Sequence, residues 1–484
     1  MSAKISNLNE LNPILMDEEK ISEGVHGMIG RFDLKRILQP LSGFKTKGIS
    51  LKMILSSLIL CRFRGLSIYA MRKSGLTQID ENTPYRIMNN SQMDWRSLVR
   101  RMAQQFLRIA CLKGEPNNAA RCFVIDDTVI AKTGKTIEGI SKVYDHVSGG
   151  YVLGFKALLL SLWDGKTLLP IDFSLHRENK NKNWGLKAKE LKEQFTKQRD
   201  ENTHGYERFK ELDEEKPSVV LKMLRRACKH NILASYVLMD SWFTTDTIIQ
   251  GIRQIRKGIM HVVGLCKMDK RKFMIDGREL NSEAIIKMKT ATKGAIHKSS
   301  RFKSTRYIKV DAIYKGTQVR LFYIMYKGSK KWKLLLTTDM SLSFVKAMEL
   351  YQIRWSIEVL FKECKQYLRL GQAQNTDFDG QIADTAITLI THIILSLQLR
   401  FEAYETMGGL FREVQNQMIQ DTICERIMKI VLEIIEQLLE FLSIDLDDTL
   451  ERLFTCDESA EKVIKILMAV NDRHKESIES KMVA

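Results

Sequence analysis

Two short apolar segments that end in aspartate place the strongest constraint on the fold. The first is R-C-F-V-I-D-D-T at residues 121–128, and the second is S-Y-V-L-M-D-S at residues 235–241. Apolar runs of about four to eight residues that are rich in β-branched side chains are typical of strands buried on both faces. We therefore expect two central strands of an α/β sheet, with carboxylates at their ends.

Further strands and helices are predicted around these two segments. A turn signal, Asp164-Gly165, separates two more apolar runs, so that three strands form a meander. A highly charged stretch follows at residues 180–215, where we expect a partly ordered excursion. The predicted elements in chain order are strands at 121–128, 151–163 and 168–175, a helix at 219–230, a strand at 235–240 and a helix at 245–257.

The remaining segments are predicted to be helical, except for one block of alternating strands at residues 259–338. One long helix is expected at 343–368, and helices are expected at 34–112 and 385–470. In the N-terminal region a helix begins after Ser91 or Asp94, and its arginines fall largely off its apolar face: Arg96, Arg100, Arg101 and Arg108. This pattern fits DNA end recognition, and an ordinary amphipathic cap is the alternative.

The net charge of +18 predicts a polyanionic partner such as nucleic acid. Residues 257–333 hold 20 Lys or Arg against 5 Asp or Glu, whereas residues 401–484 hold 9 against 18. Phosphate contacts are therefore expected in the body of the chain and not in its acidic C-terminal region. The eight cysteines lack zinc-site spacing and are typical of reduced thiols in a cytosolic protein. We find no apolar run that reaches the length of a membrane span.

The segment Tyr351–Lys365 carries a stripe of phosphate-binding side chains around one carboxylate. It contains no Pro or Gly, and on a helix these groups share a narrow face: Tyr351, Arg354, Glu358, Lys362 and Lys365. A lone carboxylate among such groups suits a divalent metal ion with DNA alongside. The alternative is a solvated face with an i,i+4 ion pair between Glu358 and Lys362.

The spacing Y-x2-R-x3-E-x6-K in this segment resembles the signature of DDE transposases of the insertion-sequence-four family, which includes the transposon-five transposase. Four fixed residues and the context R-W-S-I-E make this likeness more specific than a short motif. The resemblance extends over about residues 120–370. It implies an α/β, ribonuclease-H-like catalytic core that is interrupted by a β-strand insertion and flanked by helical N- and C-terminal regions.

The resemblance and the charge pattern together predict five regions. They are a helical N-terminal DNA-binding region at 1–115, the first part of the ribonuclease-H-like core at 116–258, a basic β-strand insertion at 259–340, the second part of the core with the Y-R-E-K helix at 341–384, and a helical C-terminal region at 385–484. The C-terminal helices either pair two protomers or pack on the catalytic core.

Three acidic residues are expected to be catalytic and to hold metal ions: Asp127, Asp240 and Glu358. Two divalent ions roughly 3.5–4 Å apart can activate the attacking oxygen and neutralise the scissile phosphate. Because neighbouring residues on a strand point to opposite faces, only one of Asp126 and Asp127 is expected to be a ligand. The family places Thr after its first acidic residue, which favours Asp127 and leaves Asp126 as the alternative.

The same resemblance implies DNA contacts for Tyr351, Arg354, Lys362 and Lys365, near the cleaved end. Trp332, in K-K-W-K-L-L-L-T, resembles a tryptophan that stacks on a base flipped from the transposon end. Such stacking contributes roughly 1–3 kcal/mol per base. Lys333 is an extra residue before L-L-L-T, and a strand tryptophan packed in a core is the alternative.

These observations predict a cut-and-paste DNA transposase that uses Mg²⁺, for which Mn²⁺ substitutes. Its partners would be double-stranded DNA, both transposon ends and target, and a second copy of the chain in a homodimeric DNA complex. A cytoplasmic, nucleoid-associated location in a bacterium is implied, without a membrane. Two alternatives are a catalytically silent DNA-binding protein of the domesticated-transposase kind and a structure-selective nuclease with the same two-metal site.

Overall fold

The computed structural model describes residues 25–45, 47–73, 79–80, 82–112, 120–178, 184–302, 305–401, 406, 407 and 410. The chain divides into two compact units, Met28–Phe411 and the pair of terminal segments Met1–Gly27 and Arg412–Ala484. Nearly all of the described residues belong to the first unit. The helical prediction for the C-terminal region lies outside the described residues from 411 onward.

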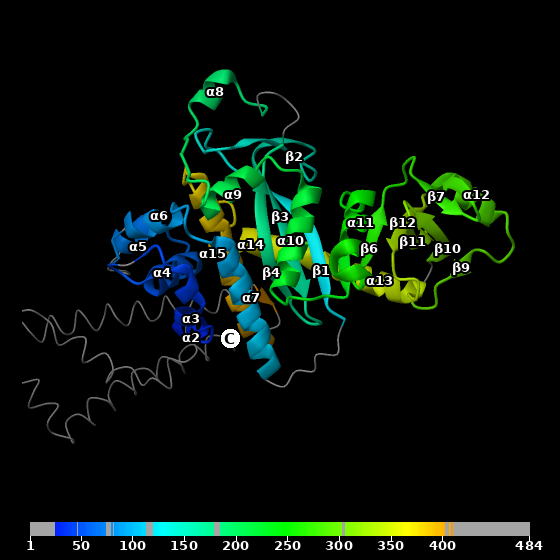
Figure 1. Ribbon diagram of the computed structural model, residues 1–484, viewed down its shortest axis with the longest axis horizontal. Coiled ribbons are helices and arrows are strands. Elements are labelled where there is room, and N and C mark those ends of the chain that lie inside the picture. Colours follow the sequence, from blue (N-terminus) through cyan, green and yellow to red (C-terminus); the bar gives the residue numbers. More distant parts are fainter. Residues whose placement is uncertain are drawn as a thin grey trace, which may run out of the picture. The chain divides into compact units, whose positions relative to one another are not determined.

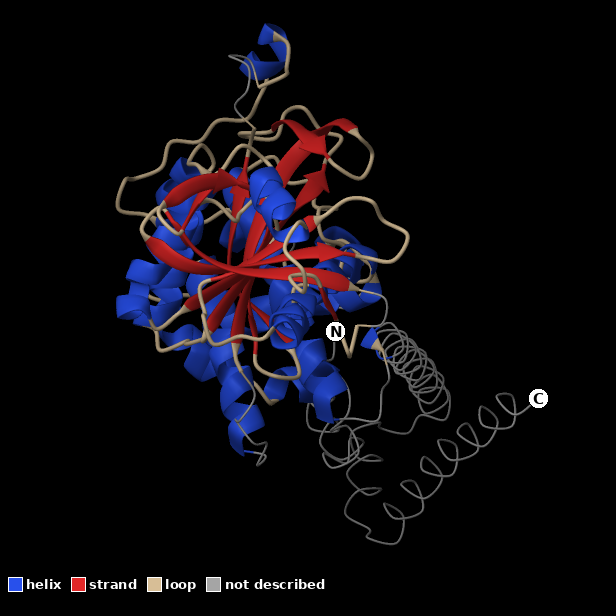
Figure 2. Ribbon diagram, turned by 90° about the vertical axis from the view of Figure 1, so that its right-hand side faces the viewer, coloured by secondary structure: helices blue, strands red, loops and turns tan. Residues whose placement is uncertain are grey.

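One large mixed sheet forms the centre of this unit, and Figure 2 shows its strands fanning out between helices. Its order is β2-β3-β1-β5-β6-β12-β11-β10-β7-β8, with β4 paired to β3 and β9 paired to β10. The strands are β1 Cys122–Ala131, β2 Ser141–Asp145, β3 Gly150–Trp163, β4 Leu168–His176, β5 Tyr236–Met239, β6 His261–Cys266, β7 Lys272–Ile275, β8 Arg278–Asn281, β9 His297–Lys298, β10 Arg306–Tyr314, β11 Thr317–Met325 and β12 Lys333–Thr337.

The part of the sheet built from β1, β3, β4, β5 and β6 follows the predicted order. β1, β3 and β4 form the antiparallel meander, and β5 and β6 continue the sheet in parallel with β1. β2 was not predicted, and it pairs with the first residues of β3. Cys122 to Ile125 of β1 are fully buried, as expected of a central strand. Three antiparallel strands followed by two parallel ones are consistent with a ribonuclease-H-like domain.

The strands predicted at residues 259–338 are present, and they continue the same sheet. β6 pairs in parallel with β5 on one side and antiparallel with β12 on the other. The range 259–340 therefore includes β6, which is a direct neighbour of β5, and the outer strands β7–β12 extend the sheet from it. This continuity could not be foreseen, because the alternating pattern of a strand does not reveal its neighbours.

Helices cover the sheet and form an N-terminal bundle (Figure 1). The helices are α2 Val25–Gly30, α3 Leu34–Leu38, α4 Leu51–Arg64, α5 Ile68–Lys73, α6 Asn82–Met88, α7 Trp95–Leu112, α8 Ala188–Lys192, α9 His204–Glu211, α10 Lys216–Lys229, α11 Asp246–Gln254, α12 Ser282–Thr290, α13 Phe344–Ile353, α14 Trp355–Gln366 and α15 Phe378–Phe401, with short 3₁₀ turns η1 Gln39–Leu41 and η2 Ile255–Gly258. Asp94 accepts a hydrogen bond from the Ser97 amide at 2.9 Å and so begins α7 at one of the two predicted positions.

The arginines of α7 do not follow the prediction. Arg96 and Arg100 are buried, whereas only Arg108 of the four is exposed. The Arg96 Nε atom lies 2.9 Å from the Asp172 Oδ1 atom of β4, and Arg96 also pairs with Glu211. The basic residues of this helix therefore serve in part to dock α7 on the sheet, and they do not form one exposed stripe.

α15 is buried along most of its length. It is long and apolar enough to cross a membrane by length and composition alone, which corrects the expectation that no run reaches that length. However, 94% of its apolar window is buried inside the structure. It packs beside α7, as Figure 1 also shows, and against α4 and β4. Burial of this kind is typical of the core helix of a globular unit.

The long helix predicted at 343–368 is divided at Arg354. α13 ends at Ile353 and α14 begins at Trp355. The Arg354 amide donates to the Tyr351 carbonyl at 3.0 Å, and the Ile357 amide donates to the Arg354 carbonyl at 3.1 Å. These i→i−3 bonds tighten one turn, although Arg354 keeps helical backbone angles. The predicted stripe of five residues is thereby shared between two helices.

Candidate active site

Asp126 and Asp240 lie side by side at one edge of the sheet. β1 and β5 are parallel neighbours, and the last pair in their ladder is Ile125 with Met239. The next residue of each segment is an aspartate, and adjacent strands are about 4.8 Å apart. Two carboxylates from segments more than a hundred residues apart are therefore brought together by the sheet itself.

Arg354 connects this edge of the sheet to Glu358. The Arg354 Nη1 atom donates to Asp126 Oδ2 at 2.9 Å, and its Nη2 atom donates to Glu358 Oε1 at 2.6 Å. Glu358 lies in the first turn of α14, one turn after Arg354. The ion pair expected between Glu358 and Lys362 in the solvated-face alternative is replaced by this pair with Arg354, and Lys362 is exposed.

The position of Asp126 beside Asp240 affects the protonation of Asp126. Burial, together with the negative charge of Asp240, raises the pKa of Asp126 to about 7, although Arg354 acts in the opposite direction. Like charges held close together disfavour ionisation of both groups. The Asp126 carboxyl group is consequently poised to change its charge near neutral pH.

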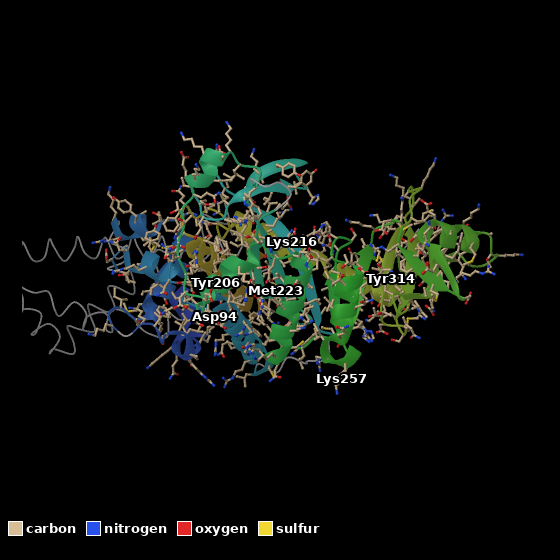
Figure 3. The ribbon with its side chains drawn as sticks, turned by 45° about the horizontal axis from the view of Figure 1, so that its top comes forward. Asp94, Tyr206, Lys216, Met223, Lys257 and Tyr314 are labelled. Atoms are coloured by element: carbon tan, nitrogen blue, oxygen red, sulfur yellow. The ribbon has the colours of Figure 1, made fainter. Side chains whose placement is uncertain are left out.

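Asp127 points to the other face of β1. Its carboxylate accepts a hydrogen bond from Lys216, the first residue of α10. Figure 3 labels Lys216 at the start of α10 and Lys257 in the 3₁₀ turn η2 that follows α11. The structure therefore brings Asp126, and not Asp127, toward Asp240 and Glu358, and the alternation expected for adjacent strand residues is observed.

A tight turn fixes Asp240. Its Oδ1 atom accepts hydrogen bonds from the Trp242 amide at 2.9 Å and the Phe243 amide at 3.1 Å. The Thr244 hydroxyl donates to the Asp240 carbonyl at 2.6 Å. Gly264 of β6 leaves the space that Thr244 fills, because a Cβ atom there would meet the Thr244 hydroxyl. The Oδ2 atom of Asp240 accepts no hydrogen bond from the residues that the structure describes.

Two other residues predicted to contact DNA, Tyr351 and Lys365, lie near these acids and differ in their burial. The Arg354 guanidinium carbon is 5.7 Å from the centre of the Tyr351 ring, and burial raises the pKa of Tyr351 to about 12. The Lys365 Nζ atom donates to the Thr128 hydroxyl of β1 at 2.7 Å. Lys365 thus lies on the Asp126 face of β1, since Thr128 and Asp126 are two residues apart.

Trp332 lies farther along this edge. Gly264 of β6 pairs with Met239 of β5 and with Leu336 of β12. Because β12 runs antiparallel to β5, Trp332 before β12 and Asp240 after β5 lie toward the same edge of the sheet. Trp332 is half-buried, and it is separated from Asp240 by two strand spacings across the sheet and by about three residues along the strands.

Sequence reasoning missed two residues near the acids, Lys216 and Trp242. Lys216 directly follows the charged stretch at residues 180–215 and belongs to no motif, so only its contact with Asp127 identifies it. Trp242 lies in D-S-W-F, two residues after Asp240, where an aromatic side chain beside a predicted acid was a usable signal.

The donor set of Asp126, Asp240 and Glu358 fits a hard divalent cation. All three supply carboxylate oxygens, which Mg²⁺ prefers, and a cation would relieve the repulsion that raises the pKa of Asp126. Over the described ranges, no group of three or more His, Cys, Asp or Glu side chains is already arranged around a metal position. The Arg354 guanidinium supplies the positive charge between Asp126 and Glu358 instead.

Two family models match the segments of the chain that carry these acids. Residues 41–263 match the family described as DDE superfamily endonuclease, and residues 211–394 match the family described as Transposase DDE domain. The first match contains Asp126 and Asp240, and the second contains Asp240 and Glu358. The two matches, each over less than half of the chain, indicate a protein of the DDE transposase type. The comparison with curated proteins gave no match.

Proposed function

We propose that the protein is a cut-and-paste transposase of the insertion-sequence-four type, which cleaves the ends of its own element and joins them to target DNA. One observation carries the proposal. Asp126 and Asp240 follow the last paired residues of two parallel strands, and Arg354 joins Asp126 to Glu358. In a protein of the DDE transposase type, three acids in this chain order are expected to bind the metal ions that catalyse phosphodiester cleavage.

We assign the first metal-binding position to Asp126 rather than Asp127. Asp126 shares a face of β1 with Thr128 and interacts with Asp240 and Arg354, whereas Asp127 is paired with Lys216. An ion pair with a lysine satisfies the Asp127 charge without a metal ion. The threonine at position 128 favours Asp127 by family resemblance. The contacts of the two side chains favour Asp126, because only Asp126 lies on the face of β1 that interacts with Arg354.

Bound Mg²⁺, or Mn²⁺ in its place, would supply an activated oxygen nucleophile and charge neutralisation at the scissile phosphate. Asp126, Asp240 and Glu358 would hold these ions through carboxylate oxygens. The turn that includes Trp242 and Phe243 keeps Asp240 oriented while its Oδ2 atom faces the site. Arg354 compensates the acidic charge in the free protein and is well placed to donate its fork of hydrogen bonds to a phosphate when ions replace it.

The DNA contacts follow from charge and exposure. Lys362 is exposed beside the acidic cluster, and Lys365 and Tyr351 lie on the same side of the sheet. The basic outer strands of residues 259–340 are assigned to the DNA backbone, and the half-buried Trp332 is assigned to a base near the cleaved end. DNA-end binding by the N-terminal region and dimerisation through the C-terminal region belong to the same proposal.

The test uses the full-length protein and a plasmid that carries the gene with its natural flanking DNA. With Mg²⁺ we expect strand breaks at the ends of the element that leave 3′-hydroxyl groups, followed by joining to a second plasmid. Glu358→Gln should abolish both products. Glu349→Gln, which alters a glutamate on the preceding helix that pairs with Arg301, is the matched control and should retain them.

Other outcomes identify the alternatives. Cleavage without joining to the second plasmid would indicate a structure-selective nuclease. DNA binding that is independent of Mg²⁺ and yields no cleavage product would indicate a catalytically silent DNA-binding protein. Unchanged cleavage by the Glu358→Gln variant would refute the assignment of the active site.

A further inference from the structure

Trp242 presents an exposed indole next to Asp240. Its side chain is 41% exposed, whereas the neighbouring Phe243 is 1% exposed. The backbone amide of Trp242 donates to the Asp240 carboxylate at 2.9 Å, so this tryptophan is tied to one of the three acids. An exposed indole beside a proposed metal-binding acid is accessible to a ligand that binds at the site, and tryptophan combines a large apolar face with a polar N–H group.

The indole is held firmly in this position. Phe243 packs against it edge-to-face, with ring centres 4.7 Å apart and an angle of 76° between the rings. The Lys216 Nζ atom lies 4.9 Å from the centre of the Trp242 ring, in a cation–π contact. Lys216 is itself fixed by Asp127 on β1. Two residues, Phe243 and Lys216, thus contact the ring directly, and Asp127 holds Lys216 in place.

We propose that Trp242 is a stacking platform for an unpaired DNA base that flanks the scissile phosphodiester. The inference rests on the proposed function, because it takes the phosphodiester to bind at Asp126, Asp240 and Glu358. A strand that passes round the carboxyl end of β5 would present its next nucleotide to the turn that carries Trp242, toward the Asp127 face of β1. Aromatic stacking accepts any base, since every base has a π face, and a pre-oriented ring loses little conformational entropy on binding.

This role also accounts for the pair of Asp127 and Lys216. Asp127 is not needed as a metal ligand in the proposed site, yet it fixes the lysine that contacts the Trp242 ring. Lys216 therefore acts as a positioning residue for the platform. Its charge beside the ring would in addition attract the phosphate of the stacked nucleotide.

The experiment compares two DNA probes of equal length, one fully paired and one ending in a single-stranded oligothymidylate overhang. Binding by the full-length protein is measured in Ca²⁺, so that the affinity is obtained independently of cleavage. The wild-type protein should prefer the overhang probe. Trp242→Ala should weaken binding of that probe by about 5- to 150-fold, which corresponds to about 1–3 kcal/mol, and should leave the paired probe unchanged.

Two further variants control for folding and for exposure. Trp242→Phe keeps an aromatic face and should retain most of the preference for the overhang. Phe195→Ala removes an aromatic side chain of similar exposure, 40%, and should leave both affinities unchanged. A 2-aminopurine base placed along the overhang should be quenched at one position by the wild-type protein and by Trp242→Phe, and at none by Trp242→Ala.

The outcomes separate this inference from the proposed function. Normal DNA cleavage, combined with equal overhang binding by the wild type and by both Trp242 variants, would overturn the stacking role alone. Absence of cleavage by the wild type, combined with loss of the overhang preference in Trp242→Ala, would overturn the transposase proposal and support the stacking site.

Discussion

Arg354 reaches across 228 positions of the chain to Asp126, to which its Nη1 atom donates a hydrogen bond at 2.9 Å. The same guanidinium holds Glu358, so a single cation neutralises two members of the proposed catalytic set in the free protein. Arg354 is therefore shared by two acids, and its charge opposes the rise in the pKa of Asp126.

Replacing each aspartate of β1 separately should distinguish their roles. Asp126→Asn is expected to slow Mg²⁺-dependent strand cleavage by at least about 100-fold, since even residues that only support metal ligands change activity by about 10- to 100-fold. Asp127→Asn should reduce the rate by about tenfold or less, because it releases only Lys216. Single-turnover cleavage of an end-labelled DNA substrate measures both. The reverse order of effects would return the ligand to Asp127.

Metal affinity should rise with pH near neutrality. The pKa of Asp126 is about 7, and only the ionised carboxylate binds a cation well. The apparent affinity for Mn²⁺, measured by calorimetry, should therefore increase between about pH 6 and pH 8 and then level off. The same raised pKa makes a contribution to fold stability that is fully present below the ordinary carboxyl pKa of 3.8 and is lost progressively as the pH rises from there to about 7. Asp126→Asn should flatten the pH dependence of the affinity, and an unchanged slope would contradict this assignment.

Replacing Arg354 should shift the pH dependence of Mn²⁺ affinity toward higher pH. Arg354 lowers the pKa of Asp126, so Arg354→Gln should raise this pKa further and shift the rise in Mn²⁺ affinity to higher pH. Arg354→Lys keeps the charge and should shift it less. Arg301→Gln, which disrupts the pair with Glu349, serves as the control with no shift. A shift toward lower pH in Arg354→Gln would be incompatible with the proposed coupling.

The turn that holds Asp240 should be sensitive to a methyl group on β6. In Gly264→Ala the new Cβ atom would meet the Thr244 hydroxyl and lie 3.2 Å from the Met239 carbonyl oxygen. Overpacking of this kind costs about 1–3 kcal/mol, so we expect a lower midpoint of thermal unfolding and weaker Mn²⁺ binding. Gly150→Ala is a matched strand glycine with open space around it. Equal midpoints for the two variants would show that the turn tolerates the change.

The buried ion pairs beneath α7 should be important for stability. Although burial opposes its ionisation, the pairs with Arg96 and Arg226 hold the pKa of Asp172 below its ordinary value. Asp172→Asn leaves buried cations without their partner and should lower the free energy of unfolding by about 3–5 kcal/mol at neutral pH.

The exposed pair of Asp213 with Arg177 provides the comparison for Asp172, and Asp213→Asn should cost about 0–1 kcal/mol. The Asp172 contribution is present above the ordinary carboxyl pKa and is lost as the pH falls, so the difference between wild type and Asp172→Asn should shrink in acid. Urea unfolding at several pH values measures it.

The strands that end in acids could be predicted because their apolar runs and terminal aspartates are local signals. The face of β1 that carries the site could not be predicted. Alternation along a strand shows that Asp126 and Asp127 point to opposite faces, but it does not show which of these faces α14 packs against. Likewise, Arg96 looks like a surface residue in its helix, since its partner Glu211 is 115 positions away.

The central position of α15 has a consequence for synthesis of the protein. α4 and α7 are made early, yet they pack on a helix that ends at Phe401, and Arg62 of α4 pairs with Asp384 of α15. The ribosome must therefore translate most of the polypeptide before its first helices can bury their apolar faces. Until then the nascent chain exposes surface that chaperones recognise, so premature stop codons upstream of α15 should yield products destined for proteolysis rather than truncated DNA-binding fragments.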